Sequence, residues 1–346
     1  MHVGVLMVIV FVLLTEYTSA RHRAKLGIYL FNFWSAGLLL LALLAYLLPN
    51  WRDLLLASAA MGTPCLCYWW LTPESIRWLL VRDKYDEAIK YLAKIAKVNK
   101  KELPDEEVKR PDVVEEGSFR HLFLNLETTK KSLIVFDIWA TVGLVYYGVS
   151  YSSVDLGWNP YVAFALTGAI EFPSNFGTVW AADRYGRKKT TALNLICACV
   201  AAVAVVMIPS DQSKKASVNT IFRIIMAVFA KFFITNAYAS SYVWAAELFP
   251  TFIRSMALSF GSVATIVGSI CASYVIWLIR IHPMLPYGIM AFFCLQSSFV
   301  AMFLPETNGQ PTLETILDMK PKSVPTLNEN GQDDCIQEEK LELVSF

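Results

Sequence analysis

The chain has 346 residues, of which 55% are hydrophobic and only 17% are charged, and its formal net charge is +1. This composition is too apolar for an ordinary soluble domain and predicts a membrane protein. The near-neutral charge gives no support for a nucleic-acid partner. The seven cysteines lack metal-ligand or redox spacing, because the pairs Cys65/Cys67 and Cys197/Cys199 stand inside apolar runs. We therefore predict no metal and no other cofactor.

The opening segment, MHVGVLMVIVFVLLTEYTSARHR, has two interpretations. Its short apolar run and the small residues that end at Ala20 resemble a secretory signal peptide, although no Lys or Arg precedes the run. The alternative is that this segment is the first permanent membrane helix.

Eight further apolar runs are long enough to cross about 30 Å of hydrocarbon as helices. Two of them contain charged residues: Glu171 in one, and Arg223 with Lys231 in the other. With the opening segment, the sequence predicts about nine transmembrane helices and an all-α fold. The eight runs cover residues 27–50, 54–73, 138–154, 160–182, 190–210, 218–246, 255–279 and 281–305.

Basic residues near helix ends predict which side of the membrane each connection occupies. They gather in residues 21–25, 74–131 and 183–189 and at Arg254, which predicts an external N-terminus and a cytoplasmic C-terminus. Residues 74–131 mix both charge signs around one amphipathic stretch, DEAIKYLAKIAKV, and are predicted to form a cytoplasmic linker. The tail, residues 306–346, is predicted to be cytoplasmic and disordered at its end.

An internal repeat decides between the two interpretations of the opening segment. Glu16 and Glu247 each precede an arginine by seven positions, and Pro73 and Pro305 each precede a glutamate at the end of a later helix. Glu247 follows Glu16 by 231 positions, and Pro305 follows Pro73 by 232. This agreement predicts two copies of a three-helix block, so the opening segment is predicted to be a permanent helix.

The repeat also predicts a larger parent architecture. In the second copy the block is preceded by three helices and a basic loop, ADRYGRKKT, whose first-copy partner would lie before Met1. The chain is therefore predicted to correspond to helices 4–12 of a twelve-helix protein. Residues 1–73 would form the last three helices of the N-terminal half, and residues 132–305 the six-helix C-terminal half.

Four motifs carry a resemblance to a known family. ADRYGRKKT resembles the loop signature of the major facilitator superfamily, while YWWLTPESIRWLL, AELFPTFIR and LPETNGQP resemble the organic cation, anion and carnitine transporters of solute carrier family 22. The paired tryptophans and Trp78 favour this branch over sugar porters, which share the PES and PET elements. The resemblance covers about residues 5–317 and implies a multi-pass carrier in the plasma membrane. Such a carrier would move small organic ions by alternating access, without enzymatic chemistry.

Two alternatives stay open. The chain is either a carrier or a truncated, non-transporting form that associates with a full-length carrier, and uptake by this chain alone would distinguish them. A sugar-porter-type carrier is the second alternative. The predicted partners are a small organic ion and the lipid bilayer, and the oligomeric state is left open.

Acidic and basic residues at the cytoplasmic helix ends predict an inward gate. Gly186 permits the tight turn that would aim its neighbours. Each exposed pair contributes only about 0–1 kcal/mol, yet several pairs together bias a two-state equilibrium. The alternative is that these residues only anchor the chain at the cytoplasmic surface. The predicted gate consists of Glu16, Arg23, Glu74, Arg77, Asp183, Arg184, Gly186, Arg187, Glu247, Arg254 and Glu306.

Charged and aromatic residues within the spans predict the substrate path. A charge at mid-membrane costs about 2.5–3.5 kcal/mol, so Glu171 and Lys231 must face the interior or each other. A structural ion pair is the alternative to substrate contact. Aromatic rings suit amphiphilic organic ions, although each ring could equally serve packing. The candidates are Phe11, Trp139, Tyr146, Tyr147, Glu171, Lys231, Tyr242, Trp244 and Ile266.

Ile266 leaves the charge of the substrate open. The resemblance places it where cation carriers have Asp and anion carriers have Arg. Because Glu171 and Lys231 have opposite signs, we expect zwitterions first, cations second and anions third.

Overall fold

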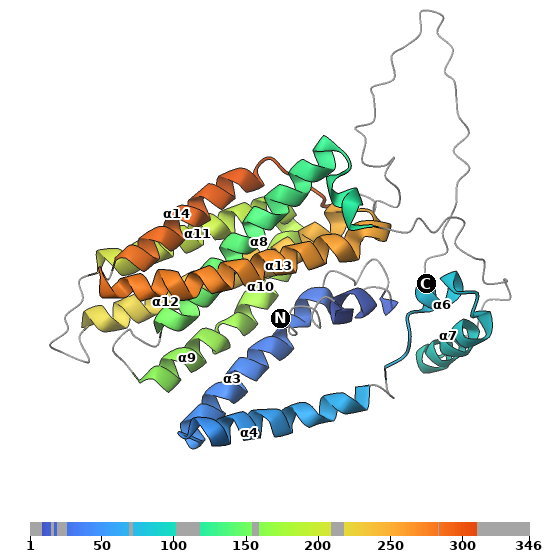
Figure 1. Ribbon diagram of the computed structural model, residues 1–346, viewed down its shortest axis with the longest axis horizontal. Helices are drawn as coiled ribbons and strands as arrows, with labels where there is room; N and C mark the ends of the chain where they lie inside the picture. The colour runs from blue at the N-terminus through green and yellow to red at the C-terminus, as the bar shows by residue number, and fades with distance from the viewer. Residues whose placement is uncertain are drawn as a thin grey trace, which may run out of the picture.

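The computed structural model describes residues 9–14, 17–18, 26–68, 72–101, 118–153, 159–208, 218–282 and 284–309. Within these ranges the chain is helical and contains no strand, which confirms the predicted all-α class. The labelled helices (Figure 1) are α3 (Phe31–Leu47), α4 (Trp51–Gly62), α6 (Ile76–Val81), α7 (Tyr85–Asn99), α8 (Leu126–Ser152), α9 (Pro160–Ala169), α10 (Glu171–Tyr185), α11 (Arg187–Met207), α12 (Val218–Leu248), α13 (Thr251–Trp277) and α14 (Leu285–Ala301). Short 3-10 turns cover Thr63–Cys67, Phe119–Phe123 and Leu278–Arg280.

Five of the described helices are long and apolar enough to cross a membrane, and α14 is a shorter apolar helix. The five spans are Leu26–Leu47, Leu126–Ser152, Arg187–Met207, Val218–Leu248 and Ile253–Arg280. They overlap the predicted runs 27–50, 138–154, 190–210, 218–246 and 255–279. The predicted orientation and the predicted domain boundaries stay predictions.

The predicted run 160–182 forms two helices, α9 and α10, which meet at Ile170. Pro173 explains the division, because proline has no amide hydrogen to donate to the carbonyl of Ala169, four residues earlier. Asn159 caps the start of α9 by accepting a hydrogen bond from the Tyr161 amide at 3.0 Å. The break places Glu171 at the first position of α10.

The core of the bundle lies where α8 packs along α13, and where α11 packs along α12 and α14. Glycines bring α8 and α13 together. A Cβ atom on Gly143 would lie 2.9 Å from the Thr265 Cα, and one on Gly268 would lie 2.7 Å from the Leu144 amide nitrogen. Small residues allow such close helix packing in membranes, where apolar burial between helices gives little driving force.

We expect Gly268→Ala to destabilise the bundle by about 1–3 kcal/mol, because the added methyl group would press against the backbone of α8. The matched control is Gly288→Ala in α14, where an added Cβ meets no heavy atom within 4 Å. Thermal unfolding of the purified variants measures both effects. Equal unfolding temperatures for the two variants would contradict the close packing.

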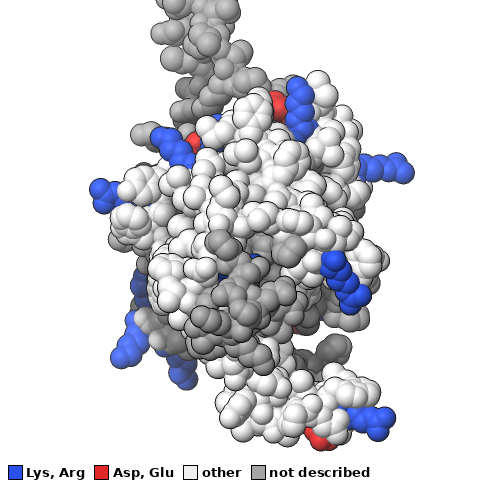
Figure 2. Space-filling model, turned by 90° about the vertical axis from the view of Figure 1, so that its left-hand side faces the viewer, with Lys and Arg blue, Asp and Glu red and all other residues white. Residues whose placement is uncertain are grey.

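The α3–α4 hairpin lies along one side of the main bundle, and α6 and α7 form a small separate unit (Figure 1). Helix α3 contacts α9 and α10, whereas α4 has no buried residue. The amphipathic stretch of the predicted linker forms α7, and Ala88 packs there against Leu79 and Leu80. Seen from the end where α3 and α4 join, the surface is mainly uncharged, with Lys and Arg scattered around its edge (Figure 2). Large exposed apolar residues such as Phe292 and Phe299 extend this uncharged surface along α14.

Candidate functional site

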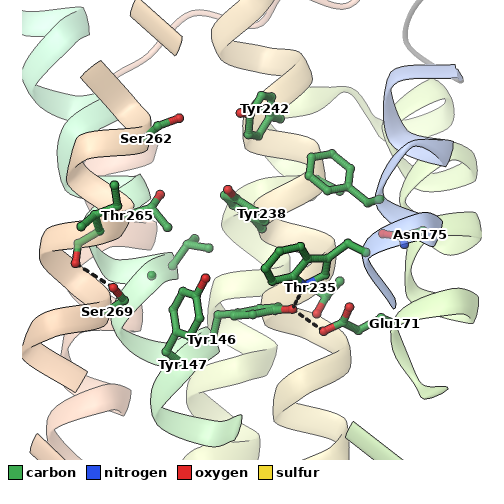
Figure 3. Close-up of a pocket in the computed structure, with 16 residues that line it drawn as sticks. Tyr146, Tyr147, Glu171, Asn175, Thr235, Tyr238, Tyr242, Ser262, Thr265 and Ser269 are labelled. Atoms are coloured by element: carbon green, nitrogen blue, oxygen red, sulfur yellow. Dashed lines mark hydrogen bonds between the residues drawn. The ribbon is translucent and has the colours of Figure 1, made fainter. Parts of the chain in front are cut away.

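A cavity of about 300 Å³ lies among α3, α8, α10, α12 and α13 (Figure 3). This volume is at the lower end of pockets that hold small organic molecules. Its wall combines aromatic rings with hydroxyl groups, one amide and one carboxylate. The lining residues are Phe31, Trp34, Val142, Gly143, Tyr146, Tyr147, Glu171, Asn175, Thr235, Tyr238, Ala239, Tyr242, Ser262, Thr265, Ile266 and Ser269.

Aromatic rings from three helices form a continuous wall of the cavity. The ring of Tyr238 lies 5.6 Å from that of Tyr242 and 6.3 Å from that of Tyr146, centroid to centroid. Tyr147 meets Tyr146 edge-on at 5.2 Å, and Phe31 of α3 meets Tyr242 at 5.4 Å. Such rings offer apolar contact and a negative face to an organic cation.

Glu171 and Lys231 form a buried ion pair beside this wall. The Lys231 Nζ lies 3.1 Å from the Glu171 Oε1, and their side chains are 1% and 2% exposed. Nζ also donates to the Ser150 Oγ at 2.8 Å and lies 2.9 Å from the ring centroid of Tyr146. Only the glutamate lines the cavity, since the lysine is held behind it and behind Tyr146.

Tyr146 connects the ion pair to α3. Its hydroxyl donates to the Glu171 Oε1 at 2.5 Å and accepts a hydrogen bond from the Trp34 Nε1 at 2.8 Å (Figure 3). The Ser35 hydroxyl donates to the Glu171 Oε2 at 2.9 Å. The glutamate is therefore held by groups from α3, α8 and α12 together, which orients its carboxylate at the cavity wall.

Hydroxyl groups of α13 form the opposite wall (Figure 3). Ser262, Thr265 and Ser269 each donate to a carbonyl of their own helix, and the hydroxyl groups of Ser262 and Thr265 also interact with those of Tyr242 and Tyr238 across the cavity. Ile266 lies among them and lines the cavity. This wall is polar but carries no charge.

Five of the predicted path residues line the cavity: Tyr146, Tyr147, Glu171, Tyr242 and Ile266. Lys231 contacts the cavity wall from behind through its ion pair.

The three remaining candidates lie outside the cavity lining. Trp139 and Phe11 pack against Tyr242, with ring centroids 4.5 Å and 5.1 Å away. Trp244 points elsewhere, because its Nε1 donates to the Pro305 carbonyl at 3.1 Å.

Sequence reasoning missed several lining residues, notably Phe31, Trp34, Asn175, Thr235 and Tyr238. Helical spacing would have found three of them. Asn175 follows Glu171 by one turn, Thr235 follows Lys231 by one turn, and Tyr238 precedes Tyr242 by one turn. No comparable signal marks the two aromatic residues of α3.

Four predicted gate residues form one cluster where α11 begins and α12 and α14 end. The Arg187 guanidinium lies 3.0 Å from the Glu247 carboxylate. The Glu306 carboxylate accepts hydrogen bonds from the amides of Arg187 and Lys188 at 2.9 and 3.2 Å. Gly186 has φ 87°, and a Cβ there would lie 2.6 Å from the Glu306 Cδ, so a glycine is required.

The other predicted gate residues are placed differently. Arg184 lies over the rings of Trp180 and Tyr185 rather than in the cluster. Glu74 accepts a hydrogen bond from the Tyr17 hydroxyl through its backbone carbonyl. Asp183 and Arg254 each make an interaction. Glu16 and Arg23 lie outside the described residues, as does the side chain of Arg77.

The apolar helices are those of a polytopic membrane protein, with a partly polar cavity between them. A family model described as "Sugar (and other) transporter" matches residues 1–318, so the chain belongs to this family of major facilitators. The fold agrees, because the proton:xylose symporter XylE superposes with a TM-score of 0.66 at 19% identity, covering 87% of this chain and 68% of the symporter.

Curated relatives lie in the predicted branch of the family. The chain is 32% identical to the "Organic cation transporter protein" of Drosophila melanogaster, over 93% of this chain and 61% of that protein. It is 32% identical to human "Solute carrier family 22 member 13", over 92% of this chain and 58% of that protein. The expected resemblance is confirmed, and the chain spans about three fifths of the length of these relatives.

Proposed function

We propose that the protein carries small organic solutes with a positively charged group across a membrane by alternating access. The observation that supports this most directly is the Glu171 carboxylate at the wall of an aromatic cavity. Carboxylate and ring faces both attract an organic cation, and both come from helices that a rocking motion would move. We place the carrier in the plasma membrane, with a cytoplasmic C-terminus.

The position of Lys231 favours cations over a model in which a zwitterion binds Glu171 and Lys231 at the same time. That model requires both charges at the wall, but Lys231 is covered by Glu171 and by the Tyr146 ring. A bound anion would meet Glu171 first, with no basic side chain among the lining residues. The cationic end of a zwitterion could still bind at Glu171.

A sugar-porter function is the second candidate, because the family name includes sugars and the cavity contains hydroxyl groups. The carboxylate at the wall favours an ion instead, since a neutral sugar gains little from it. A non-transporting partner of a longer carrier is the third possibility, and the uptake experiment below addresses it.

The decisive experiment compares three solutes of similar shape: choline, glycine betaine and 3,3-dimethylbutanoate, which are a cation, a zwitterion and an anion. We expect cells that express this 346-residue chain, and no related carrier, to take up choline best. The variant Glu171→Gln with Lys231→Met keeps the pair neutral and should lower choline uptake by roughly tenfold or more, because the ammonium group loses its attraction to the carboxylate and about 1.4 kcal/mol corresponds to a factor of ten.

The matched control is Glu127→Gln with Lys131→Met, which removes an ion pair at the start of α8 with a glutamate side chain that is 54% exposed. Uptake should be unchanged there. Equal choline uptake by both double variants would reject Glu171 as the cation site. Uptake of none of the three solutes by the unmodified chain, despite its presence at the cell surface, would reject the organic-ion carrier and favour the non-transporting alternative.

A further inference from the structure

Polar residues lie at two successive levels where α10 and α12 pack against each other, and three of the four line the cavity. Glu171 and Asn175 are one turn apart on α10, and Lys231 and Thr235 are one turn apart on α12. The first level is closed by the ion pair between Glu171 and Lys231. Further along both helices, the Ser174 hydroxyl donates to the Phe232 carbonyl at 2.8 Å, so the two helices stay in contact. Asn175 and Thr235 thus share the second level.

At the second level, unlike the first, polar side-chain atoms are left without hydrogen-bond partners. Asn175 is fully buried and Thr235 is 5% exposed, and both line the cavity. The Asn175 Oδ1 and the Thr235 Oγ1 have no hydrogen-bond partner. The amide orientation is set by its nitrogen, which donates to the Asn32 Oδ1 at 2.9 Å. Buried polar atoms normally have partners, so two at one level of a cavity indicate a place for a ligand group.

We propose that Asn175 and Thr235 form a subsite for a hydroxyl group of the transported solute. A hydroxyl both donates and accepts, so it can donate to the Asn175 Oδ1 and accept from the Thr235 hydroxyl. With Glu171 one turn away on the same face, the solute would be a small cation that carries a hydroxyl group beside its charged centre. This inference rests on the proposed function and adds the second recognition group.

The test uses choline and propyltrimethylammonium, which have the same charge and differ by a hydroxyl in place of a methyl group. Ligand-dependent thermal unfolding of the purified protein gives the affinity for each. We expect the unmodified protein to prefer choline by roughly 5- to 10-fold, the effect of one net hydrogen bond. Thr235→Val should reduce this preference, because only the hydrogen bond to the Asn175 Oδ1 would remain, and Thr235→Ser should retain it.

The ligand-free protein supplies an independent readout. Because the Thr235 hydroxyl has no partner, Thr235→Val should leave the unfolding temperature unchanged or raise it. The control is Thr167→Val in α9, which removes a hydroxyl that donates to the Phe164 carbonyl at 2.7 Å. That variant should unfold at a lower temperature and keep the preference for choline.

The outcomes separate the subsite from the proposed function. Equal binding of the two probes by the unmodified protein, or an undiminished preference in Thr235→Val, overturns the subsite and leaves the cation site at Glu171 standing. Binding of neither probe overturns both.

Discussion

Replacing Lys231 alone with methionine is expected to destabilise the protein by about 3–5 kcal/mol, because it leaves the Glu171 carboxylate buried without its counter-charge. Glu171→Gln alone should be similarly harmful, since the ammonium group would lose its counter-charge and keep only neutral partners such as the Ser150 hydroxyl and the Tyr146 ring. The double variant should recover most of the loss, because a neutral pair has no uncompensated charge. Thermal unfolding of the purified single and double variants measures the effect.

This non-additivity is the diagnostic result. Two independent polar contacts would give a double variant with the summed loss of the single variants, whereas a coupled buried pair gives a double variant more stable than either. Summed losses would show that the two charges do not act as a pair. The exposed pair of Lys84 and Glu87, 3.9 Å apart, is the control, and its single variants should change stability by less than about 1 kcal/mol.

Glu306→Ala is expected to cost about 2–3 kcal/mol and to lower uptake. Its carboxylate caps the start of α11 by accepting from the amides of Arg187 and Lys188, and it also accepts from the amides of Thr307 and Asn308. A negative group at a helix N-terminus satisfies free amides and interacts favourably with the helix dipole. The loss should also loosen Arg187 from Glu247.

The stability of Glu306→Gln should fall between those of the unmodified protein and Glu306→Ala, because the glutamine keeps one acceptor oxygen. Thermal unfolding and choline uptake are measured for both variants. Glu87→Ala is the matched control, since that glutamate is 57% exposed and forms only a surface pair. A Glu306→Ala protein as stable and active as the control would show that the cluster does not hold the helix ends together.

The cluster at the helix ends was partly predictable from local sequence. A glycine between two helices and alternating acids and bases mark a turn with ion pairs, and Gly186, Arg187, Glu247 and Glu306 do meet. Arg184 could not be assigned in the same way, because the choice between a carboxylate and the neighbouring Trp180 ring depends on the direction in which α10 ends. Ion pairing between separate helices is a property of their packing.

The division of the run 160–182 could also have been predicted from the sequence, since Pro173 interrupts the hydrogen bonds of any helix that contains it. The predicted run is therefore made of two helices that meet at Ile170. The consequence for the site is direct, because the interruption places Glu171 at the start of a new helix.

Sequence alone determined the helical membrane class, the major facilitator resemblance and the ionisable residues at mid-membrane. These follow from the length of apolar runs, from contiguous motifs and from the cost of a charge in hydrocarbon, which are all local properties. Only the tertiary structure decided that Glu171 lines the cavity while Lys231 stands behind it, that Trp244 turns away to Pro305, and that Phe31 and Trp34 complete the wall. Lipid and protein core are both apolar, so a membrane helix carries little pattern to show which face looks inward. The rotation of each helix, and with it the composition of the cavity, is set by the fit between neighbouring helices.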